Sequence, residues 1–333
     1  MRALITSDWH LGYPPRYRGH DDDIRFAAEQ IVHLSEEVSH VFLLGDILHM
    51  AYRIPNRVLI DLKKILDRIA EHARVYLIPG NHDYHIHSIY RLFNSERIRC
   101  LDQPETIWIN DIKIALIPFV IKNHPAADIA RALVRESDVI MCHQCAMKHL
   151  EDERFPTTIW LKFRDEFILA VGDKLTFAGH YHIPTHLDNI YYCGCISPLS
   201  IDDIEHVHGC WIWNMDSGEV EFREIKNREW HVISSYRDHD HLIEIIRSDP
   251  EAVYYIRAYA DEIPELRRIT RDYRVILSVI ADQKANDYEV SDEHERLIRM
   301  SDEDLLRMYL QLKGVELDER LLSLHREIAE VRG

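Results

Sequence analysis

The sequence predicts a protein of the α/β class, and two observations support that prediction. Short apolar runs bounded by turn residues recur through residues 1–225, as expected for buried strands. Between several of these runs, apolar residues recur at the three- and four-residue spacing of amphipathic helices. Helices that alternate with buried strands indicate an α/β sandwich, in which helices cover the faces of the sheets.

The first part of the chain shows this alternation most clearly. Arg2–Thr6, His40–Leu44 and Arg74–Ile78 are short apolar runs that we interpret as buried strands. A helix is expected in each of the two intervals between them, because apolar residues there follow helical spacing. These residues are Ile24, Ala28, Ile31, Leu34 and Val38 in the first interval, and Val58, Leu62, Ile65, Leu66 and Ile69 in the second.

The strand series continues and then gives way to a region of different composition. Further strands are expected at Ile112–Pro118, Val139–Cys142, Leu175–Ala178 and Ile190–Cys193, followed by a hairpin of Cys210–Asn214 and Val220–Ile225. From Glu229 the chain is highly charged and helix-rich, with one strand expected at Ala252–Ala260. We therefore predict a main domain at 1–228, a smaller accessory region at 229–290, and a C-terminal helical pair at 291–333. Ser301 and Asp304 resemble a capping box that opens the first helix of this pair.

Composition limits the possible functions. The 333 residues suffice for one large core and a smaller appendage, and the formal net charge of −17 argues against a basic surface that coats DNA. A nuclease whose metal ions supply local positive charge remains compatible with that balance. No secretory signal is recognisable, and no stretch approaches the roughly 18 apolar residues of a membrane span. We expect a soluble, cytoplasmic protein without membrane contact, in the host cytoplasm if a phage encodes it.

Two cysteine pairs, Cys142/Cys145 and Cys193/Cys195, leave a zinc or redox role open. We interpret them as ordinary reduced thiols, because no second Cys-x-x-Cys follows and Cys142 lies in an apolar run.

Five polar segments stand where a predicted strand ends, which is the usual edge for a site in an α/β sheet. They are Asp8-Trp9-His10, Gly45-Asp46, Gly80-Asn81-His82-Asp83, His143, and Gly179-His180-Tyr181-His182. Carboxylates, an amide oxygen and imidazoles without thiolate suit Mn²⁺, Fe²⁺ or Zn²⁺ better than a structural zinc cage. If two ions bind, one carboxylate must bridge them, and Asp46 is the candidate.

This ordered set of motifs resembles the calcineurin-like metallophosphoesterases over residues 1–225. The resemblance implies a double β-sandwich flanked by helices, two divalent metal ions, and hydrolysis of phosphoesters by water that the two ions activate. It also implies the ligands of each ion: Asp8, His10, Asp46 and His182 for one, and Asp46, Asn81, His143 and His180 for the other. His82 would protonate the leaving oxygen; the alternative is that it only orients a ligand.

Within that family the chain resembles the SbcD-like nuclease subunits and their phage relatives. His49 stands three residues after Asp46, as in that group, and would position or stabilise the phosphate; a helix-entry histidine without a role is the alternative. The resemblance implies a manganese-dependent exo- and endonuclease that acts on DNA in recombination, repair or phage DNA processing. It further implies a homodimer, paired near Arg57–Ile69 and Ile86–Phe93, and an SMC-like ATPase partner that the C-terminal helices contact.

Three arginines are candidate DNA contacts: Arg16 and Arg18 in the loop after the first motif, and Arg53. A solvated loop would show the same pattern. One departure from the group concerns the stretch from Tyr191 to Pro198, which reads Tyr-Tyr-Cys-Gly-Cys-Ile-Ser-Pro where the group has a Gly-Ser pair. This leaves open how the stretch supports the metal-binding histidines. Two other functions also remain open: a stand-alone phosphoesterase for a nucleotide, small phosphoester or phosphoprotein, and a non-catalytic adaptor.

Overall fold

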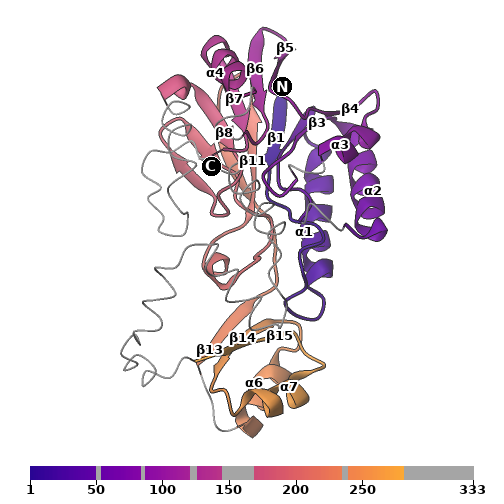
Figure 1. The fold of residues 1–333 in the computed structure, drawn as a ribbon, viewed down its shortest axis with the longest axis vertical. Helices are drawn as coiled ribbons and strands as arrows, with labels where there is room; N and C mark the ends of the chain where they lie inside the picture. Colours follow the sequence, from indigo (N-terminus) through magenta and orange to yellow (C-terminus); the bar gives the residue numbers. More distant parts are fainter. Residues whose placement is uncertain (50–53, 84–86, 121–125, 145–168, 235–238, 281–333) are drawn as a thin grey trace, which may run out of the picture. The chain divides into compact units, whose positions relative to one another are not determined.

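A computed structural model confirms the α/β class, with two mixed six-stranded sheets flanked by helices (Figure 1). The structure describes residues 1–49, 54–83, 87–120, 126–144, 169–234 and 239–280. Residues 1–258 and 262–278 form one compact unit, and the second unit, 259–261 and 279–333, lies almost entirely outside the described residues. Within the described part of the chain, no helix is long and apolar enough to cross a membrane.

The first sheet places the strands that precede three of the polar segments side by side. Its strand order is β12-β11-β1-β2-β3-β4, with β1 to β4 parallel and β11 antiparallel to both β1 and β12. The carboxyl ends of β1, β2 and β3 therefore meet at one edge. The strands are β1 Arg2–Thr6, β2 His40–Leu44, β3 Arg74–Ile78, β4 Ile98–Cys100, β11 Gly209–Asn214 and β12 Val220–Glu224.

The second sheet does the same for the other two segments. Its order is β5-β6-β7-β8-β10-β9, and β6, β7, β8 and β10 are parallel. The strands are β5 Glu105–Ile109, β6 Ile112–Ile117, β7 Val139–Cys142, β8 Leu175–Ala178, β9 Thr185–Leu187 and β10 Ile190–Tyr192. The sequence did not indicate β4, β5 or β9, which are edge or near-edge strands of three to five residues. Such short strands carry too few residues for a clear alternating pattern.

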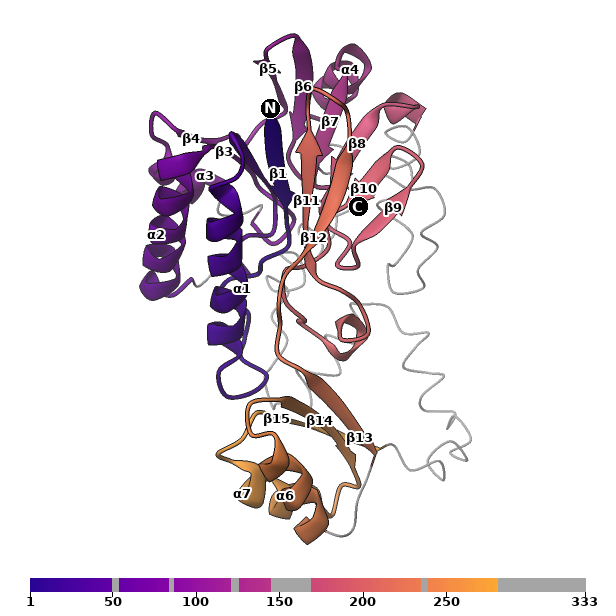
Figure 2. The ribbon, with the colours of Figure 1, turned by 180° about the vertical axis from the view of Figure 1, so that it is seen from behind.

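Apolar burial on both faces of each sheet explains why these runs are strands. Helices α1 His20–Ser35 and α2 Asn56–His72 cover the outer face of the first sheet, and their buried residues share a core with β1, β2 and β3 (Figure 2). Helix α4 Ala126–Glu136 covers the second sheet. A third cluster, which includes Ile5, Phe42, Phe177 and Trp213, lies between the two sheets. Strands with two buried faces read as continuous apolar runs, as β2 does.

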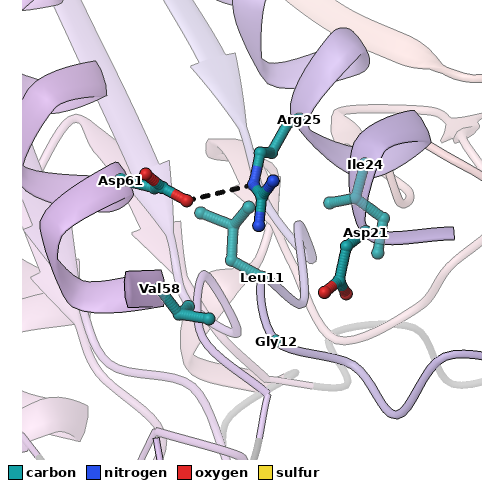
Figure 3. Close-up of a pocket in the computed structure, with 7 residues that line it drawn as sticks. All are labelled: Leu11, Gly12, Asp21, Ile24, Arg25, Val58 and Asp61. Carbon is teal, nitrogen blue, oxygen red and sulfur yellow. Dashed lines mark ion pairs between the residues drawn. The ribbon is translucent and has the colours of Figure 1, made fainter. Parts of the chain in front are cut away.

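An ion pair joins the two helices beside the loop that follows β1. Arg25 Nε of α1 lies 3.1 Å from Asp61 Oδ2 of α2, and both residues line a small pocket with Leu11 and Gly12 (Figure 3). Val58 and Ile24 supply the apolar walls of this pocket. The pair therefore fixes α1 and α2 where the chain leaves the first polar segment.

The accessory region contains a three-stranded sheet and two helices, so the strand expected at Ala252–Ala260 is confirmed as the central strand, and two further strands were not indicated by the sequence. The strands β13 Trp230–Ser234, β14 Val253–Ala258 and β15 Val275–Val279 adjoin in that order, with α6 His239–Ser248 and α7 Ile263–Thr270 in the connections. β13 and β15 are five residues each in strongly charged surroundings, which hid them. The predicted helical pair at 291–333 lies outside the described residues, and the predicted domain boundaries stay predictions.

The core between α1 and the first sheet should dominate local stability. Ile31 is fully buried on α1, whereas Phe26 on the same helix is 54% exposed. We expect Ile31→Ala to lower the free energy of unfolding by about 2–5 kcal/mol, because it leaves a cavity. Phe26→Ala, the matched control, should change it by about 0.5 kcal/mol or less. Urea denaturation followed by circular dichroism measures both; equal losses would contradict the packing described here.

Candidate metal and phosphoester site

The five polar segments predicted from the sequence meet at one place. Asp8 donates its backbone N–H to the carbonyl of Gly45 at 3.0 Å, and His10 donates to the carbonyl of Asp46 at 2.9 Å. Gly179 donates to the carbonyl of Cys142 at 2.9 Å, which joins the β7 and β8 ends in the same way. These hydrogen bonds join neighbouring loops just after the ends of adjacent strands. The side chains carried by these loops therefore converge.

One group of side chains contains Asp8, His10 and His182, whose ligand atoms all lie within 4.8 Å of one another. The Nε2 atoms of His10 and His182 are 3.2 Å apart, and His182 Nε2 lies 4.0 Å from Asp8 Oδ1. Asp8 accepts the backbone N–H of His180 at 3.0 Å and the hydroxyl of Ser7. A carboxylate and two imidazoles at this spacing form a candidate metal-binding group.

A second group surrounds Asp46. Its ligand atoms are those of Asp8, Asp46 and His143, again within 4.8 Å of one another. His143 Nε2 lies 3.3 Å from Asp46 Oδ2 and 3.1 Å from Asn81 Oδ1. Asn81 Oδ1 is also 2.8 Å from His180 Nδ1. Asp46 Oδ2 lies 3.8 Å from His10 Nε2 as well, so this carboxylate is within reach of both groups.

The backbone is left-handed at four of the predicted ligands. Among the described residues, six non-glycine residues have a positive φ, and Asp8 (53°), His10 (50°), Asp46 (52°) and His180 (80°) are four of them. L-residues seldom adopt this conformation, which costs free energy and concentrates at functional sites. The packing of the two sheets holds the strain in place, and it aims these side chains at one point.

Glycine is required beside them because the loops pass too close for a side chain. A Cβ atom on Gly80 would lie 2.5 Å from the backbone nitrogen of Asp46, and one on Gly179 would lie 2.7 Å from His143 Nδ1. A Cβ on Gly45, where φ is 86°, would lie 2.7 Å from the nitrogen of Gly80.

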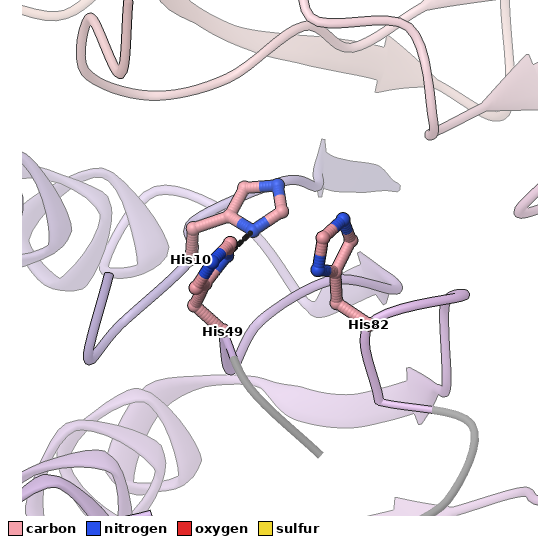
Figure 4. A group of neighbouring side chains, drawn as sticks. All are labelled: His10, His49 and His82. Atoms are coloured by element: carbon pink, nitrogen blue, oxygen red, sulfur yellow. Dashed lines mark hydrogen bonds between the residues drawn. The ribbon is translucent and has the colours of Figure 1, made fainter. Parts of the chain in front are cut away.

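His49 and His82 stand next to His10 at the edge of the site (Figure 4). His49 Nδ1 lies 2.9 Å from His10 Nδ1, and the rings of His49 and His82 stack with centroids 4.8 Å apart. Asp46 Oδ1 accepts the backbone N–H of His82 at 2.8 Å, which fixes the start of that side chain. Both histidines therefore lie beside the predicted metal ligand His10.

Electrostatics at the centre favour a cation. The pKa of the Asp8 carboxyl is raised to about 8, foremost by burial; the nearby His143 acts to lower this pKa, and the Asp46 carboxylate acts to raise it. Burial also acts to raise the pKa of Asp46, but His143 foremost holds it below its usual range. Burial would lower the pKa of His143, yet Asp46 and Asp8 raise it to about 9. The two buried carboxylates thus hold a positive charge between them, as a proton on His143 or as a metal ion.

The imidazoles of His10, His49, His180 and His182 are held neutral, which is the form that ligates metals. Burial lowers the pKa of His180 to about 3 and, with His82 nearby, that of His49 to about 4. Burial also lowers the pKa of His10 and His182.

Two residues near the site were not assigned a role from the sequence. Asp83 is fully buried and accepts the backbone N–H groups of Ile47 and Leu48, both at 3.1 Å, so it ties the β3 loop to the β2 loop. Its place in the Gly-Asn-His-Asp motif was a usable signal. Tyr13 packs its ring against His49 with centroids 4.3 Å apart, and its place in the basic and aromatic loop Tyr13–Gly19 was the only signal for it in the sequence.

The candidate DNA contacts lie in different settings. Arg16 Nη2 donates to the Tyr13 hydroxyl at 2.8 Å, so it lies one side chain from His49. Arg18 makes an exposed ion pair with Asp272, with Nη1 and Oδ1 3.6 Å apart. Arg53 and Cys145 lie outside the described residues. Cys193 and Cys195 are buried free thiols in the structure, and Cys142 is buried at the end of β7.

Comparison with known proteins decides the family. Residues 1–258 match the calcineurin-like phosphoesterase family, which is more than half of the chain. The chain belongs to that family. The family predicted from the motifs is therefore confirmed, and the protein is a metal-dependent phosphoester hydrolase.

Individual relatives are more distant. The chain is 22% identical over 248 residues to exonuclease subunit 1 of Enterobacteria phage T4, which covers 69% of each protein. A dimetal phosphatase from Danio rerio superimposes with a TM-score of 0.43 and 13% identity, over 68% of this chain and 96% of the other. An archaeal phosphodiesterase does so with a TM-score of 0.37 and 14% identity, over 68% of this chain and all of the other.

The residues present fit the dinuclear metal site of the calcineurin-like phosphoesterases. Two buried carboxylates, one amide oxygen and four imidazoles converge there from both sheets, as the distances above establish. Oxygen and imidazole donors suit divalent ions such as Mn²⁺, Fe²⁺ and Zn²⁺. The assignment of each ligand to one ion or the other stays a prediction.

The close approach of the loops gives a test that does not alter any ligand. Gly80→Ala should push the Asp46 loop away from His143. We expect Mn²⁺ binding to weaken by at least about tenfold, which is the usual loss when the residues that orient a metal ligand are disturbed. Gly218→Ala, in the open β11–β12 turn where no atom lies within 4 Å of an added Cβ, is the control and should leave binding unchanged, although its φ of 78° strains an alanine backbone. Calorimetric titration with Mn²⁺ measures both; equal effects would show that the loops tolerate a Cβ.

Proposed function

We propose that this phosphoesterase is a manganese-dependent DNA nuclease that works as a homodimer with an SMC-like ATPase. The observation that carries the proposal is the histidine cluster of His10, His49 and His82 (Figure 4). His49 occupies the position expected for the SbcD-like nucleases and lies in direct contact with His10, at 2.9 Å. The relative from phage T4, an exonuclease subunit by description, supports the same substrate class and the presence of a partner.

The chain's own residues divide the work of hydrolysis. Two divalent ions bound by the seven ligands would supply an activated water molecule and neutralise charge on the phosphoryl oxygens. As the oxygen of water bonds to phosphorus, the ester P–O bond breaks and His82 donates a proton to the leaving oxygen. His49, neutral because burial lowers its pKa to about 4, would donate a hydrogen bond to a phosphate oxygen. Asp46 holds the start of the His82 loop through the backbone hydrogen bond of 2.8 Å, and it would bind the ions through its other carboxylate oxygen.

DNA rather than a small phosphoester is favoured by the loop beside His49. Tyr13 and Arg16 form a connected pair there, with a hydrogen bond of 2.8 Å and the guanidinium carbon 5.5 Å from the ring centroid. An arginine can bind a phosphate oxygen and a tyrosine can stack on an unpaired base. The same loop would serve a DNA strand on either side of the cleaved bond, so exo- and endonuclease activities are both proposed.

The accessory region and the C-terminal segment complete the proposal. Residues 229–290 would contact DNA, and residues 291–333 would contact the ATPase. With a formal net charge of −17, the chain would gain DNA affinity from such partners, since phosphate contacts require positive charge.

The nuclease proposal predicts the effect of two single substitutions. Wild type should cleave labelled single- and double-stranded DNA with Mn²⁺, and His82→Ala should lower kcat by about 10²–10⁴, the usual contribution of a general acid. His49→Ala should lower kcat/KM by at least about tenfold through a lost contact to the phosphate. His33→Ala, a histidine on α1 with a side chain 71% exposed, is the control and should match wild type.

Absence of Mn²⁺-dependent DNA cleavage by wild type, together with turnover of bis(p-nitrophenyl) phosphate, would contradict the nuclease proposal. It would favour the alternative of a phosphoesterase for small substrates. Normal cleavage by His82→Ala would instead restrict His82 to orienting a ligand.

The homodimer is supported by apolar side chains that are exposed in the expected region. Ile60 on α2 is 53% exposed, and Leu92 in the 3₁₀ turn Arg91–Phe93 is 77% exposed. Sedimentation equilibrium at micromolar concentration should give the mass of two chains, and the double substitution Ile60→Glu with Leu92→Glu should give one. Trp108→Glu, 64% exposed on β5, is the control and should leave the dimer intact. A monomeric wild type would refute the dimer.

A further inference from the structure

The segment after β10 departs from the pattern of related nucleases, and the structure reveals what it does. Cys195 donates its backbone N–H to the carbonyl of His182 at 2.9 Å, so the segment is bonded directly to the last predicted ligand. Gly194, with φ at 72°, passes so close to Pro184 that a Cβ atom would lie 2.5 Å from the proline ring. This contact fixes the segment beside the His180–His182 loop.

The same segment continues to a buried carboxylate, that of Asp203, which lies near the His180–His182 loop. Asp203 ends the short 3₁₀ turn Ile201–Asp203 and is 4% exposed. Its Oδ2 atom accepts three hydrogen bonds, from the backbone N–H groups of Leu199 at 3.1 Å and Ser200 at 2.8 Å and from the Ser200 hydroxyl at 2.9 Å. The His208 ring nitrogens lie 3.0 Å from the carbonyl oxygens of Cys195 and Asp203. The carboxylate is therefore rigidly held.

This rigid carboxylate lies near a predicted metal ligand. His182, Cys195 and Asp203 each place one potential ligand atom within 4.8 Å of the other two. His182 Nε2 is engaged toward the centre, at 3.2 Å from His10 Nε2 and 4.0 Å from Asp8 Oδ1. The other ring nitrogen of His182, Nδ1, is then available to a neighbour that lies outside the metal site. Since the His182 side chain is 33% exposed, packing alone does not fix its ring.

We propose that Asp203 is a positioning residue for the metal centre, orienting His182 by accepting the hydrogen of its second ring nitrogen. A carboxylate in this role fixes the tautomer that presents Nε2 to the ion and increases the basicity of that nitrogen. The proposal rests on the family's metal site and not on DNA as the substrate.

Metal binding by the intact chain tests the proposal without any catalytic assay. Asp203→Asn keeps the size of the side chain and an oxygen for the bonds from Leu199 and Ser200. We expect it to weaken one of the two Mn²⁺ sites by about 10–100-fold in calorimetric titration, and to leave the other within about threefold. Ser200→Ala removes one bond to the same carboxylate and is the matched control; both Mn²⁺ affinities should then stay within about twofold of wild type.

A double-mutant cycle separates positioning from a general effect on folding. In the His182→Ala background, Asp203→Asn should cause no further loss of Mn²⁺ affinity, because its effect acts through His182. An equal loss in both backgrounds would overturn the proposal, as would unchanged binding by Asp203→Asn alone. Binding of a third Mn²⁺ that Asp203→Asn removes would also overturn it, since Asp203 would then be a ligand. Each result is independent of whether the protein cleaves DNA.

Discussion

The structure depends on the burial of two carboxylates at the junction of its two sheets. Asp8 is fully buried and Asp46 nearly so, and both face His143. Removing a carboxylate from water is costly unless positive charge and hydrogen bonds compensate. Here the hydrogen bonds come from backbone N–H groups of His180 and His82 and from Ser7, and the remaining need for positive charge is what makes the site a cation site.

The surrounding fold holds the two buried carboxylates in place. Parallel strands in both sheets bring their carboxyl ends to one point, and left-handed residues such as Asp46 then turn the chain within a single residue. Glycines at 80 and 179 let neighbouring loops approach to distances that no side chain permits. Buried Asp83 ties two of these loops together, and Asp203 would extend the same principle outward to His182. Strain at the site is thus balanced by the apolar cores on both sides of the sheets.

The sequence predicted the structure best where a buried strand is followed directly by a candidate metal ligand. The runs at 2–6, 40–44 and 74–78 are strands with those bounds, because both of their faces are buried and their apolar runs are continuous. The ligands could be named because each follows such a run. The β13 and β15 strands were missed because their neighbours are charged and their strands are short. The contacts of Tyr13 with His49 and of Asp203 with the His182 loop join distant segments, and no local pattern records them.

The account rests on Asp46 as the carboxylate shared by two ions, and electron paramagnetic resonance of the Mn²⁺-loaded protein tests this most directly. A shared carboxylate requires two Mn²⁺ roughly 3.5–4 Å apart. The account predicts two ions per chain with an exchange-coupled signal, which Asp46→Asn replaces by the six-line signal of isolated Mn²⁺. A wild-type protein with only isolated Mn²⁺ signals at saturation, or coupling that survives Asp46→Asn, would contradict it.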